Sequence, residues 1–546
     1  MNDVVQAERS SAKESGLDFD AIVIGAGVSG LYQLYRLREL GMTARVFEAG
    51  SGVGGTWYWN RYPGARFDSE SWTYGYSFSQ ELLDEWDWEE HFAAQPETER
   101  YLNHVADRFD LRRDIQFSTV VTAAHYREDS NSWDLTLDNG THCTARFLIT
   151  AVGVLSAPTM PRIPGVESFK GESCHTHSWP KEPVSFAGKR VAVIGTGATG
   201  IQTITEVAKT AAHLTVFQRT AQWSAPLHNS KVTPEEMKKI RENYQDIFAR
   251  CQETVGCFIH AADPRSVFEV TEAEREAFWE MLYGEPGFGI WMGNFRDVLM
   301  DRDANTLMSE YLARKIRERV KDQAVAEKLV PKNHGFGMRR VPLESGYFEV
   351  YNQPNVKLVD LLETPITAIT PTGIRTSDAD HEFDMIIYAT GFDAITGAFD
   401  RIDIRGVGGV SLKEKWQDGP RTLLGILVDG FPNFMMVMGP HAGLGNFPRA
   451  VEYTSDWVTA LIRHARDRGM TRVDATPEGV AGWTDHVIET NEGLLFTEAD
   501  SWMTGINRNV DGKDVRRVMR YSGGHPAFRQ RCDAVSGSGY QELSLS

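Results

Sequence analysis

The pattern of apolar positions predicts a strand, a helix and a second strand near the start of the chain. Residues 19–24 are a short apolar run, and leucines then recur at every third position from Leu31 to Leu40, which is helical spacing. Gly41 favours the end of this helix, and residues 44–47 form the next apolar run. Together these segments predict a parallel βαβ unit over residues 19–48.

The same pattern returns further along the chain. Residues 189–194 predict a strand, 201–212 a helix and 214–217 a second strand. In both units a glycine-rich turn joins the first strand to the helix, at Gly25-Ala-Gly27-Val-Ser-Gly30 and at Gly195-Thr-Gly197-Ala-Thr-Gly200. The chain therefore repeats one supersecondary unit and has no short solenoid period.

The segment after the second unit is helical, and strands follow it. Capping boxes at Thr233 and Thr271 mark helix starts between residues 224 and 330, and strand-like runs return after residue 340. We predict an α/β fold with two Rossmann-like dinucleotide-binding domains, the first of them discontinuous, plus a helical insertion. The expected divisions are a flexible N-terminal tail at 1–18, a first nucleotide domain at 19–155 and 385–546, a second at 156–223 and 331–384, and the insertion at 224–330.

Composition excludes several classes of protein. The 546 residues carry a formal net charge of −18, which argues against nucleic acid or an anionic membrane as partner. None of the five cysteines forms a CxxC pair, so neither a metal cluster nor a redox disulfide is expected. The N-terminus does not resemble a signal peptide, and no apolar stretch is long enough to span a membrane. We expect reduced thiols and a cytoplasmic protein.

The residues around the first glycine turn predict its nucleotide. Gly25, Gly27 and Gly30 let the backbone approach a pyrophosphate at a helix N-terminus. Glu48, at the end of the second strand, would accept hydrogen bonds from ribose hydroxyls and repel a 2′-phosphate. This turn is therefore expected to bind FAD or NAD(H); the alternative is a plain glycine turn.

The second turn lacks that acid. Gln218, Arg219 and Thr220 stand at the equivalent strand end, and an arginine there can hold a 2′-phosphate with two parallel hydrogen bonds. The sequence thus predicts NADPH in preference to NADH, unless Arg219 is only an exposed loop residue.

Two further motifs bear on the chemistry. Gly54-Gly55-Thr56-Trp57 suits a loop that folds along a flavin. Asp68 follows in a loop that contains proline and glycine and has no obvious structural role there; the alternative is that Asp68 is a solvated turn residue. A third run, from Phe169 to Pro180, stands directly ahead of the second unit.

With these motifs, nearly the whole chain resembles the single-chain, FAD- and NADPH-dependent Baeyer–Villiger monooxygenases (type I, class B flavoproteins), the group of the cyclohexanone, phenylacetone and steroid monooxygenases. The fingerprint of that family, FxGxxxHxxxW followed by Pro or Asp, is matched by Phe169, Gly171, His175, Trp179 and Pro180. Related flavin-dependent monooxygenases have Phe or Tyr in place of Trp179. The Gly54–Asp68 block, Ala389-Thr-Gly391 and Ser501-Trp502 also resemble the family's motifs.

The resemblance implies roles for single residues. Arg340 matches the catalytic arginine, Asp68 its carboxylate partner, and Trp502 an aromatic residue on a mobile loop that meets NADP(H) or substrate. Arg339 falls where the family usually has a lysine that contacts NADP(H), and Phe67 replaces a smaller residue. The positions that match FAD contacts are Ser29, Thr56, Trp57, Tyr74 and Val121, and those that match NADP contacts are Thr196, Gly197, Ala198, Thr199, Gly200 and Gln202.

The implied reaction is the conversion of a ketone, expected to be cyclic or bulky, to an ester or lactone with NADPH and O2, by way of a C4a-peroxyflavin. A monomer or weak oligomer is expected. For His175 a structural or hinge role is favoured over a catalytic one, because it precedes the second unit in what resembles a linker. The alternatives are N- or S-oxygenation by a flavin monooxygenase and a non-enzymatic NADP(H)/FAD redox sensor.

Overall fold

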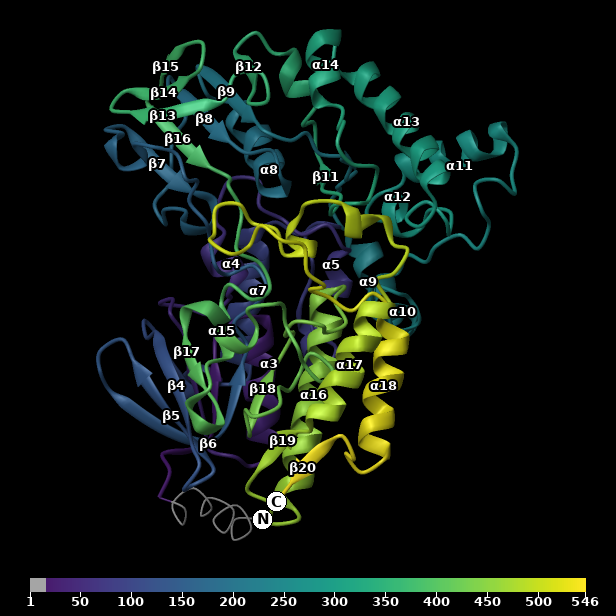
Figure 1. Cartoon of the computed structure of the whole chain (residues 1–546). Helices are drawn as coiled ribbons and strands as arrows, with labels where there is room; N and C mark the ends of the chain where they lie inside the picture. Colours follow the sequence, from purple (N-terminus) through teal and green to yellow (C-terminus); the bar gives the residue numbers. More distant parts are fainter. Residues whose placement is uncertain (1–15) are drawn as a thin grey trace.

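The computed structural model describes residues 16–546. Residues 1–15 of the expected tail lie outside the described part. The molecule has two halves, each built on a sheet, and the last part of the chain crosses between them (Figure 1). The α/β fold predicted from the sequence is confirmed.

The first sheet takes strands from both ends of the chain. Its order is β17-β4-β5-β6-β1-β2-β3, with β18 beside the second half of β6. β5 is antiparallel to β4 and β6, whereas β1 lies parallel to β2 and β6. The strands are β1 (Phe19–Ile24), β2 (Ala44–Phe47), β3 (Ile115–Gln116), β4 (Val121–Arg127), β5 (Ser132–Leu137), β6 (His142–Thr150), β17 (Asp403–Arg405) and β18 (Phe434–Met436).

The second sheet is entirely parallel, with the order β12-β9-β8-β16-β7. Its strands are β7 (Glu172–His175), β8 (Arg190–Ile194), β9 (His213–Gln218), β12 (Val356–Asp360) and β16 (Met385–Tyr388). A small antiparallel sheet, β13 (Ile366–Thr370), β14 (Gly373–Thr376) and β15 (Asp380–Glu382), lies beside it.

Two expectations about the second half are corrected by strand pairing. β16 pairs with β7 and β8, so the boundary expected at residue 385 falls too early, and this strand belongs to the second sheet. The residues before the second unit are not a linker, because β7 forms the edge strand of that sheet. Neither pairing has a local signal, since both join strands that are distant in the sequence.

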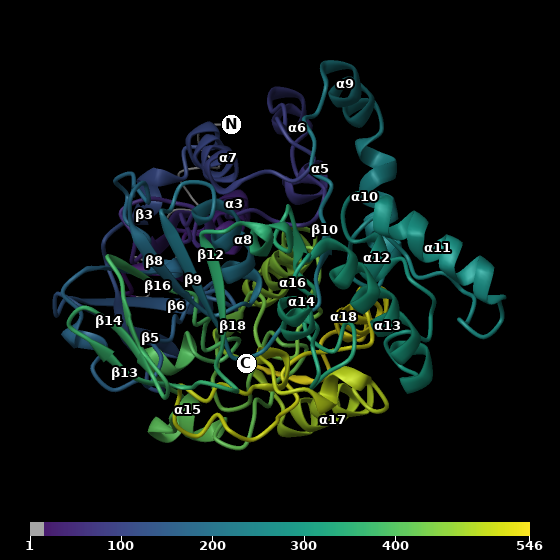
Figure 2. The ribbon, with the colours of Figure 1, turned by 90° about the horizontal axis from the view of Figure 1, so that it is seen from above.

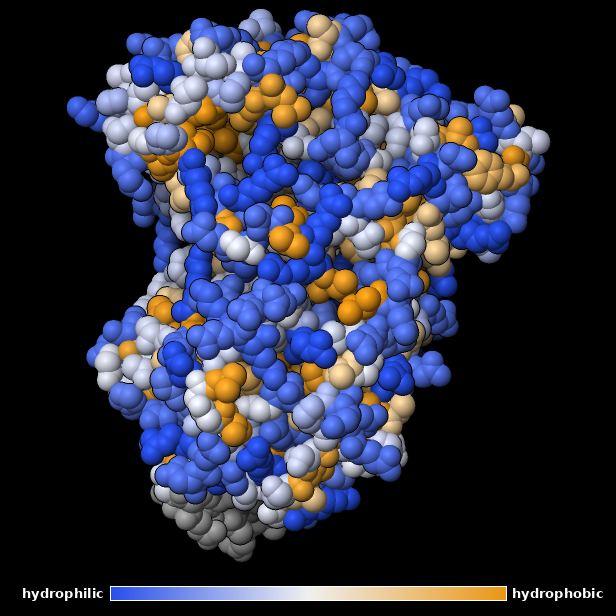
Figure 3. All heavy atoms as spheres, viewed as in Figure 1, coloured by the Kyte–Doolittle hydropathy of each residue, from blue (hydrophilic) through white to orange (hydrophobic). Residues whose placement is uncertain are grey.

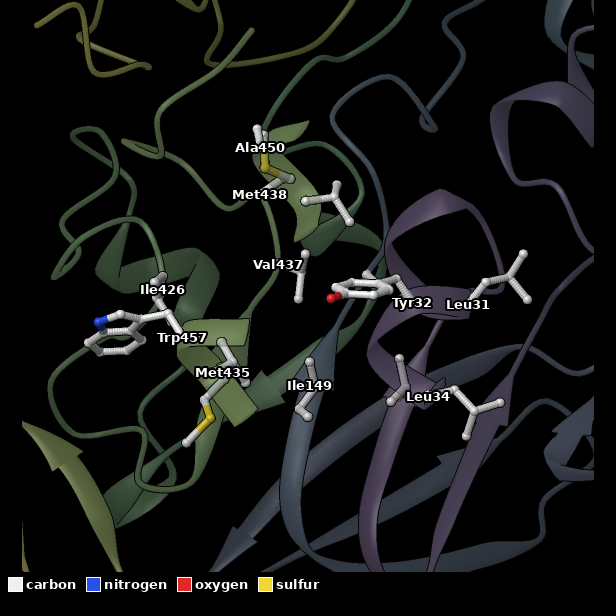
Figure 4. Close-up of a cluster of buried hydrophobic side chains, with 14 of the residues drawn as sticks. Leu31, Tyr32, Leu34, Ile149, Ile426, Met435, Val437, Met438, Ala450 and Trp457 are labelled. Carbon is white, nitrogen blue, oxygen red and sulfur yellow. The ribbon is translucent and has the colours of Figure 1, made fainter. Parts of the chain in front are cut away.

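The core of the first half lies between its sheet and two long helices. α3 (Val28–Glu39) packs against α16 (Phe447–Arg466), with the Tyr32 hydroxyl donating to Asp456 at 2.8 Å and the Gln33 amide to Thr459 at 3.1 Å. Figure 4 shows side chains from α3, β6, β18 and α16 meeting in this apolar cluster. Burial of these apolar faces fixes the helix that follows the first glycine turn.

The helical insertion extends from one side of the molecule (Figure 2), and its first two helices pack against the core of the first half. The capping boxes predicted at Thr233 and Thr271 both form. The helical segment that begins after Thr233 is divided at Asn243, where the first helix ends and the second begins. The helices are α9 (Pro234–Glu242), α10 (Tyr244–Glu253), α11 (Glu272–Gly284), α12 (Gly289–Met292), α13 (Arg302–Arg319) and α14 (Gln323–Leu329).

The remaining elements cover the two halves. They are α4 (Thr56–Trp59), α5 (Ser71–Tyr74), α6 (Gln80–Glu85), α7 (Gln95–Arg108), α8 (Ala198–Val207), α15 (Leu412–Lys415), α17 (Pro477–Glu489), α18 (His525–Gly537), the pair β10 (Ala225–Pro226) and β11 (Leu343–Glu344), the pair β19 (Val473–Ala475) and β20 (Leu543–Leu545), and short 3-10 turns. Among residues 16–546 no helix is long and apolar enough to cross a bilayer. The face in Figure 3 is mainly hydrophilic, with small separate apolar patches.

Candidate functional site

The first glycine turn forms as predicted at the end of β1. Gly25 has a φ of +103°, and a Cβ there would lie 2.6 Å from the Ala151 carbonyl oxygen. A Cβ on Gly30 would overlap the Gly25 carbonyl oxygen. α3 begins after Gly27 with no side chain capping its first amides. The free amides and bare backbone suit a pyrophosphate.

Glu48 stands directly after β2, beside this turn. Its carboxylate accepts hydrogen bonds from the backbone amides of Ala26 and Gly50, both at 2.7 Å. Burial raises the pKa of Glu48. The two amide bonds hold the carboxylate in place next to Gly25–Gly30, the position in which the sequence predicts contact with a ribose.

The loop after β2 folds back onto the same turn. A Cβ on Gly55 would lie 2.8 Å from the Gly27 Cα, so only glycine allows this approach. The indole N–H of Trp57 donates to the Tyr74 hydroxyl at 3.1 Å, and the Phe67 ring stacks on the Tyr74 ring with their centres 4.2 Å apart. The other predicted flavin contacts begin local elements: Ser29 is buried in the first turn of α3, Thr56 opens α4 and Val121 opens β4.

The second glycine turn repeats the geometry at the end of β8. Gly195 has a φ of +109°, and a Cβ on Gly200 would lie 2.3 Å from the Gly195 carbonyl oxygen. A Cβ on Gly197 would meet no atom within 4 Å, so the space before α8 is open. Ala198 and Thr199 form the first turn of α8, and the Thr196 hydroxyl donates to the Thr220 carbonyl at 2.9 Å.

Gln202 on α8 joins the two nucleotide-binding units. Its side-chain oxygen accepts from the Tyr62 hydroxyl at 2.7 Å, and its amide donates to the Arg66 carbonyl at 3.1 Å. Gly64, with a φ of +82°, lies so close that a Cβ would be 2.7 Å from the Gln202 carbonyl oxygen. The loop that leads to Asp68 therefore rests directly on the helix of the second unit.

Arg219 and Arg339 lie close enough, near the second turn, for their charges to interact. Neither makes an ion pair with a carboxylate within residues 16–546, and the Nε of Arg339 has no hydrogen-bond partner. Burial and the Arg508 charge lower the pKa of Arg219; burial and the Arg219 charge lower that of Arg339. Arg219 is exposed and Arg339 half-buried, and their like charges repel each other. An anion bound between them, such as the predicted 2′-phosphate, would relieve this repulsion.

The structure brings Arg340 and Asp68 together from distant parts of the chain. Nη1 of Arg340 lies 2.6 Å from Oδ2 of Asp68, which also accepts from the Leu343 amide at 3.2 Å. Asp68 is 1% exposed and Arg340 29%, and the guanidinium lies 5.7 Å from the Phe288 ring centre. One edge of the arginine is thus fixed by a buried carboxylate while the rest remains accessible.

Trp502 begins a 3-10 turn, Trp502–Thr504, in the segment that crosses between the halves (Figure 1). It packs against an apolar cluster that includes Val154, Ile395 and Met519. The segment is anchored by Lys513, whose ammonium donates to Asp393 at 2.6 Å and to Asp400 at 2.9 Å. Sequence reasoning missed Lys513, because a single lysine in a charge-rich loop gives no sign of its partners.

The fingerprint residues lie along β7 and the turn after it. A Cβ on Gly171 would be 2.6 Å from the Asp384 carbonyl oxygen, which explains the glycine. His175 accepts from the His177 amide at 3.1 Å, and burial lowers its pKa. The His177 ring stacks on the Trp59 ring with their centres 5.4 Å apart. Of the others, Phe169 packs against the second sheet, Trp179 is buried beside Phe186, and Pro180 is exposed.

Two parallel βαβ units with glycine turns, joined at Gln202 and lying near a fixed arginine, define an enzyme that binds two dinucleotides. Comparison with known proteins narrows this class. Residues 20–250 match the family model described as flavin-binding monooxygenase-like.

Relatives match almost end to end. A 2-oxo-Δ3-4,5,5-trimethylcyclopentenylacetyl-CoA monooxygenase of Pseudomonas putida is 47% identical, covering 96% of this chain and 98% of its own. A Baeyer–Villiger monooxygenase of Pseudooceanicola batsensis is 40% identical, covering 98% of each chain. A phenazine N-monooxygenase of Lysobacter antibioticus is also 40% identical, covering 96% of this chain and 97% of its own.

The crystal structure of OTEMO in complex with FAD and NADP superimposes with a TM-score of 0.94 at 46% identity, covering 97% of this chain and all of the other. The chain belongs to the Baeyer–Villiger monooxygenases, flavoenzymes that use FAD and NADPH to convert ketones to esters or lactones. The predicted class, reaction and cofactors are confirmed.

Proposed function

We propose that this enzyme oxidises cyclic or bulky ketones to lactones or esters, with Arg340 and Asp68 as its catalytic pair. The observation that carries the assignment is the 2.6 Å ion pair between a buried carboxylate and a partly exposed guanidinium. When bound, FAD takes a hydride from NADPH and activates O2 for insertion beside the carbonyl carbon. The protein must supply positive charge where negative charge develops on oxygen.

Arg340 supplies that charge. A guanidinium stays protonated at any physiological pH, so it stabilises an oxyanion without giving up a proton, whereas a lysine would transfer one more readily. Asp68 holds the guanidinium through one oxygen, and the Leu343 amide in turn fixes that oxygen. The remaining N–H groups of Arg340 then face the reacting oxygens with little reorganisation.

The residues that would hold the cofactors follow from the two glycine turns. The flavin site would be formed by Gly25, Gly27, Ser29, Gly30, Glu48, Gly55, Thr56, Trp57, Tyr74, Val121 and Asp68. The NADP(H) site would be formed by Thr196, Gly197, Ala198, Thr199, Gly200, Gln202, Arg219, Thr220, Arg339 and Trp502. The open space at Gly197 and the uncapped start of α3 support both assignments.

The segment around Trp502 would exclude water from the site. Its apolar contacts and the Lys513 anchor hold it across the junction of the two halves. The fingerprint would act as a junction, because His177 of its turn stacks on Trp59 of the first unit. We also propose the predicted domain division, with β16 moved to the second domain.

Two further expectations join this proposal. The large apolar side chains that are exposed, such as Phe268, Leu362 and Val515, lie on separate segments, which supports a monomer or weak oligomer. All five cysteines are unpaired, which supports a reducing, cytoplasmic compartment.

N-oxygenation is the second candidate, because one relative is a phenazine N-monooxygenase. The Arg340–Asp68 pair favours the ketone reaction, since a permanent cation stabilises an oxyanion, and attack on an amine or ring nitrogen forms none. Parallel assays with a cyclic ketone and with phenazine, read by product analysis, distinguish the two candidates.

The decisive experiment is Arg340→Ala. We expect NADPH to reduce the flavin at close to the wild-type rate while lactone formation is abolished, because the hydride step does not need the oxyanion site. Wild-type lactone formation in this variant would refute the catalytic assignment. Arg472→Ala, which removes an arginine paired with Asp474 on β19, is the control for loss of an ion pair.

A further inference from the structure

Arg520 is a half-buried arginine that lacks a carboxylate partner. It forms no ion pair within residues 16–546, and its Nε is shielded from solvent and has no hydrogen-bond partner. Its guanidinium contacts the Met503 sulfur at 3.6 Å and lies 5.3 Å from the centre of the Phe496 ring. Burial lowers the pKa of Arg520. The side chain therefore carries an uncompensated charge in a low-dielectric place.

The backbone fixes Arg520 beside the proposed site. The Met519 carbonyl accepts from the His441 amide at 3.2 Å, and the Arg520 carbonyl accepts from the Asn491 side chain at 3.1 Å. Met519, the neighbour of Arg520, packs in the same cluster as Trp502. Arg520 therefore lies next to the cluster that holds Trp502.

The residues around Arg520 are linked to the loop that carries Arg340. The Leu495 amide, next to Phe496, donates to the Leu299 carbonyl, and the Leu299 side chain fills the space beside Gly337, where a Cβ would overlap it. Gly337 begins the run that ends in Arg340. Arg520 and Arg340 are therefore linked by a short chain of contacts.

Two acids near Trp502 are already paired with other arginines. Glu498 lies 2.5 Å from Arg302, and Asp500 pairs at 2.9 Å with both Arg508 and Arg516. Neither of these two carboxylates neutralises Arg520. An anion from outside the chain would supply the counter-ion.

Other arginines without an ion pair within residues 16–546 show how the chain satisfies such a side chain. Arg146, whose pKa burial also lowers, donates to the carbonyl groups of Ser130 and Asn131. Arg219 and Arg339 have neither carbonyl nor carboxylate partners and are proposed above to hold a 2′-phosphate. Arg520 belongs to this second kind, but lies next to the cluster that holds Trp502 instead of at the glycine turn.

We propose that Arg520 binds an oxyanion carried by the substrate, so that the preferred ketone bears a carboxylate or phosphate group remote from its carbonyl. This inference rests on the proposed ketone reaction. Phe496 and Met503 would shield the ion pair from water and so strengthen it, and the guanidinium fork would orient the anion while Arg340 meets the carbonyl.

The test compares 4-oxocyclohexanecarboxylate with its methyl ester on the FAD-loaded enzyme. We expect Arg520→Met to lower kcat/KM for the carboxylate by about 10- to 100-fold, the usual range for losing a charge-assisted hydrogen bond, and to affect the ester far less. Arg520→Lys should restore most of the carboxylate activity. Arg517→Met is the matched control: it lies on the same segment and donates only to the carbonyl groups of Gly512 and Gln417.

Calorimetric binding of both ketones to the oxidised, NADP+-bound enzyme gives a second readout. The carboxylate should bind the wild type more tightly than the ester, and Arg520→Met should remove that difference. The proposal would be overturned if Arg520→Met weakened the binding of both ketones equally, or if the wild type bound the carboxylate no more tightly than the ester. Weaker NADP+ binding in Arg520→Met would also overturn it, because the arginine would then belong to the cofactor site. If the wild type converts neither ketone, the proposed function fails, while the binding preference still decides the Arg520 site.

Discussion

Asp68→Asn is the sharpest test of how the catalytic pair works. The substitution removes the negative charge but keeps the size of the side chain and an oxygen that can accept from the Leu343 amide. It therefore tests the electrostatic hold on Arg340 separately from packing. We expect the rate of flavin reduction to stay close to that of the wild type, the rate of lactone formation to fall, and more of the consumed NADPH to appear as hydrogen peroxide.

The structure sets the size of this effect. Two unit charges about 4 Å apart attract by about 4 kcal/mol at an effective dielectric constant of about 20. Asp68 is buried, but Arg340 is 29% exposed, so water screens part of the attraction. A loss of about 3 kcal/mol in the oxygen-transfer step corresponds to a rate about 100-fold lower.

The assay separates the two halves of the reaction. Anaerobic stopped-flow mixing with NADPH follows flavin bleaching, and chromatography of lactone together with a peroxide assay measures coupling. Asp474→Asn is a matched control, because Asp474 is 9% exposed and lies 2.9 Å from Arg472, which is 30% exposed, on β19 far from the site. Wild-type coupling in Asp68→Asn would refute the reasoning, and an equal fall in both half-reactions would show a structural role only.

Two further predictions concern the cofactor and pH. Arg219→Ala should raise the KM for NADPH by about 10- to 100-fold and that for NADH much less, because only NADPH has the 2′-phosphate; steady-state kinetics with an unchanged preference would contradict the assignment. Burial raises the pKa of Glu97 from 4.5 to about 7. Between these two pH values the folded protein keeps a proton on Glu97 that the unfolded chain releases. The free energy of unfolding therefore falls as the pH rises from about 4.5 to 7. Glu97→Gln should therefore raise Tm at pH 8 by roughly 2–4 °C and change it little at pH 4.5, as thermal melts would show; an equal rise at both pH values would contradict this sign.

The sequence predicted best what local patterns determine. Both glycine turns, the helices after them and the capping boxes depend on residues within a few turns of each other, so single-chain periodicity was sufficient. The pairing of β16 with β7 and β8 could not be predicted in this way, because the partners of a fully apolar strand are chosen by packing. The boundary at residue 385 and the linker interpretation of His175 failed for this reason.

The site residues differ in how much of their role the sequence alone predicts. Arg340 and Asp68 were paired through resemblance alone, since no local signal connects them. Arg219 could be interpreted directly, because it takes the place of an acid at a strand end. Arg520 gave no signal: it is one of three arginines between residues 516 and 520, and only the packing reveals that its Nε is shielded and has no hydrogen-bond partner.

The charge of the whole chain strengthens the interpretation of these arginines. With 75 acidic and 57 basic residues, carboxylates are in excess, so a buried arginine without one is not explained by a shortage of partners. Within residues 16–546, Arg219, Arg339 and Arg520 form no ion pair, although the nearby Asp500 pairs with Arg508 and Arg516. A fold that leaves cations uncompensated at a ligand site loses stability there, and binding of anionic ligands offsets that loss. Under the two proposals above, the cofactor phosphate would account for two of these charges and an anionic substrate for the third.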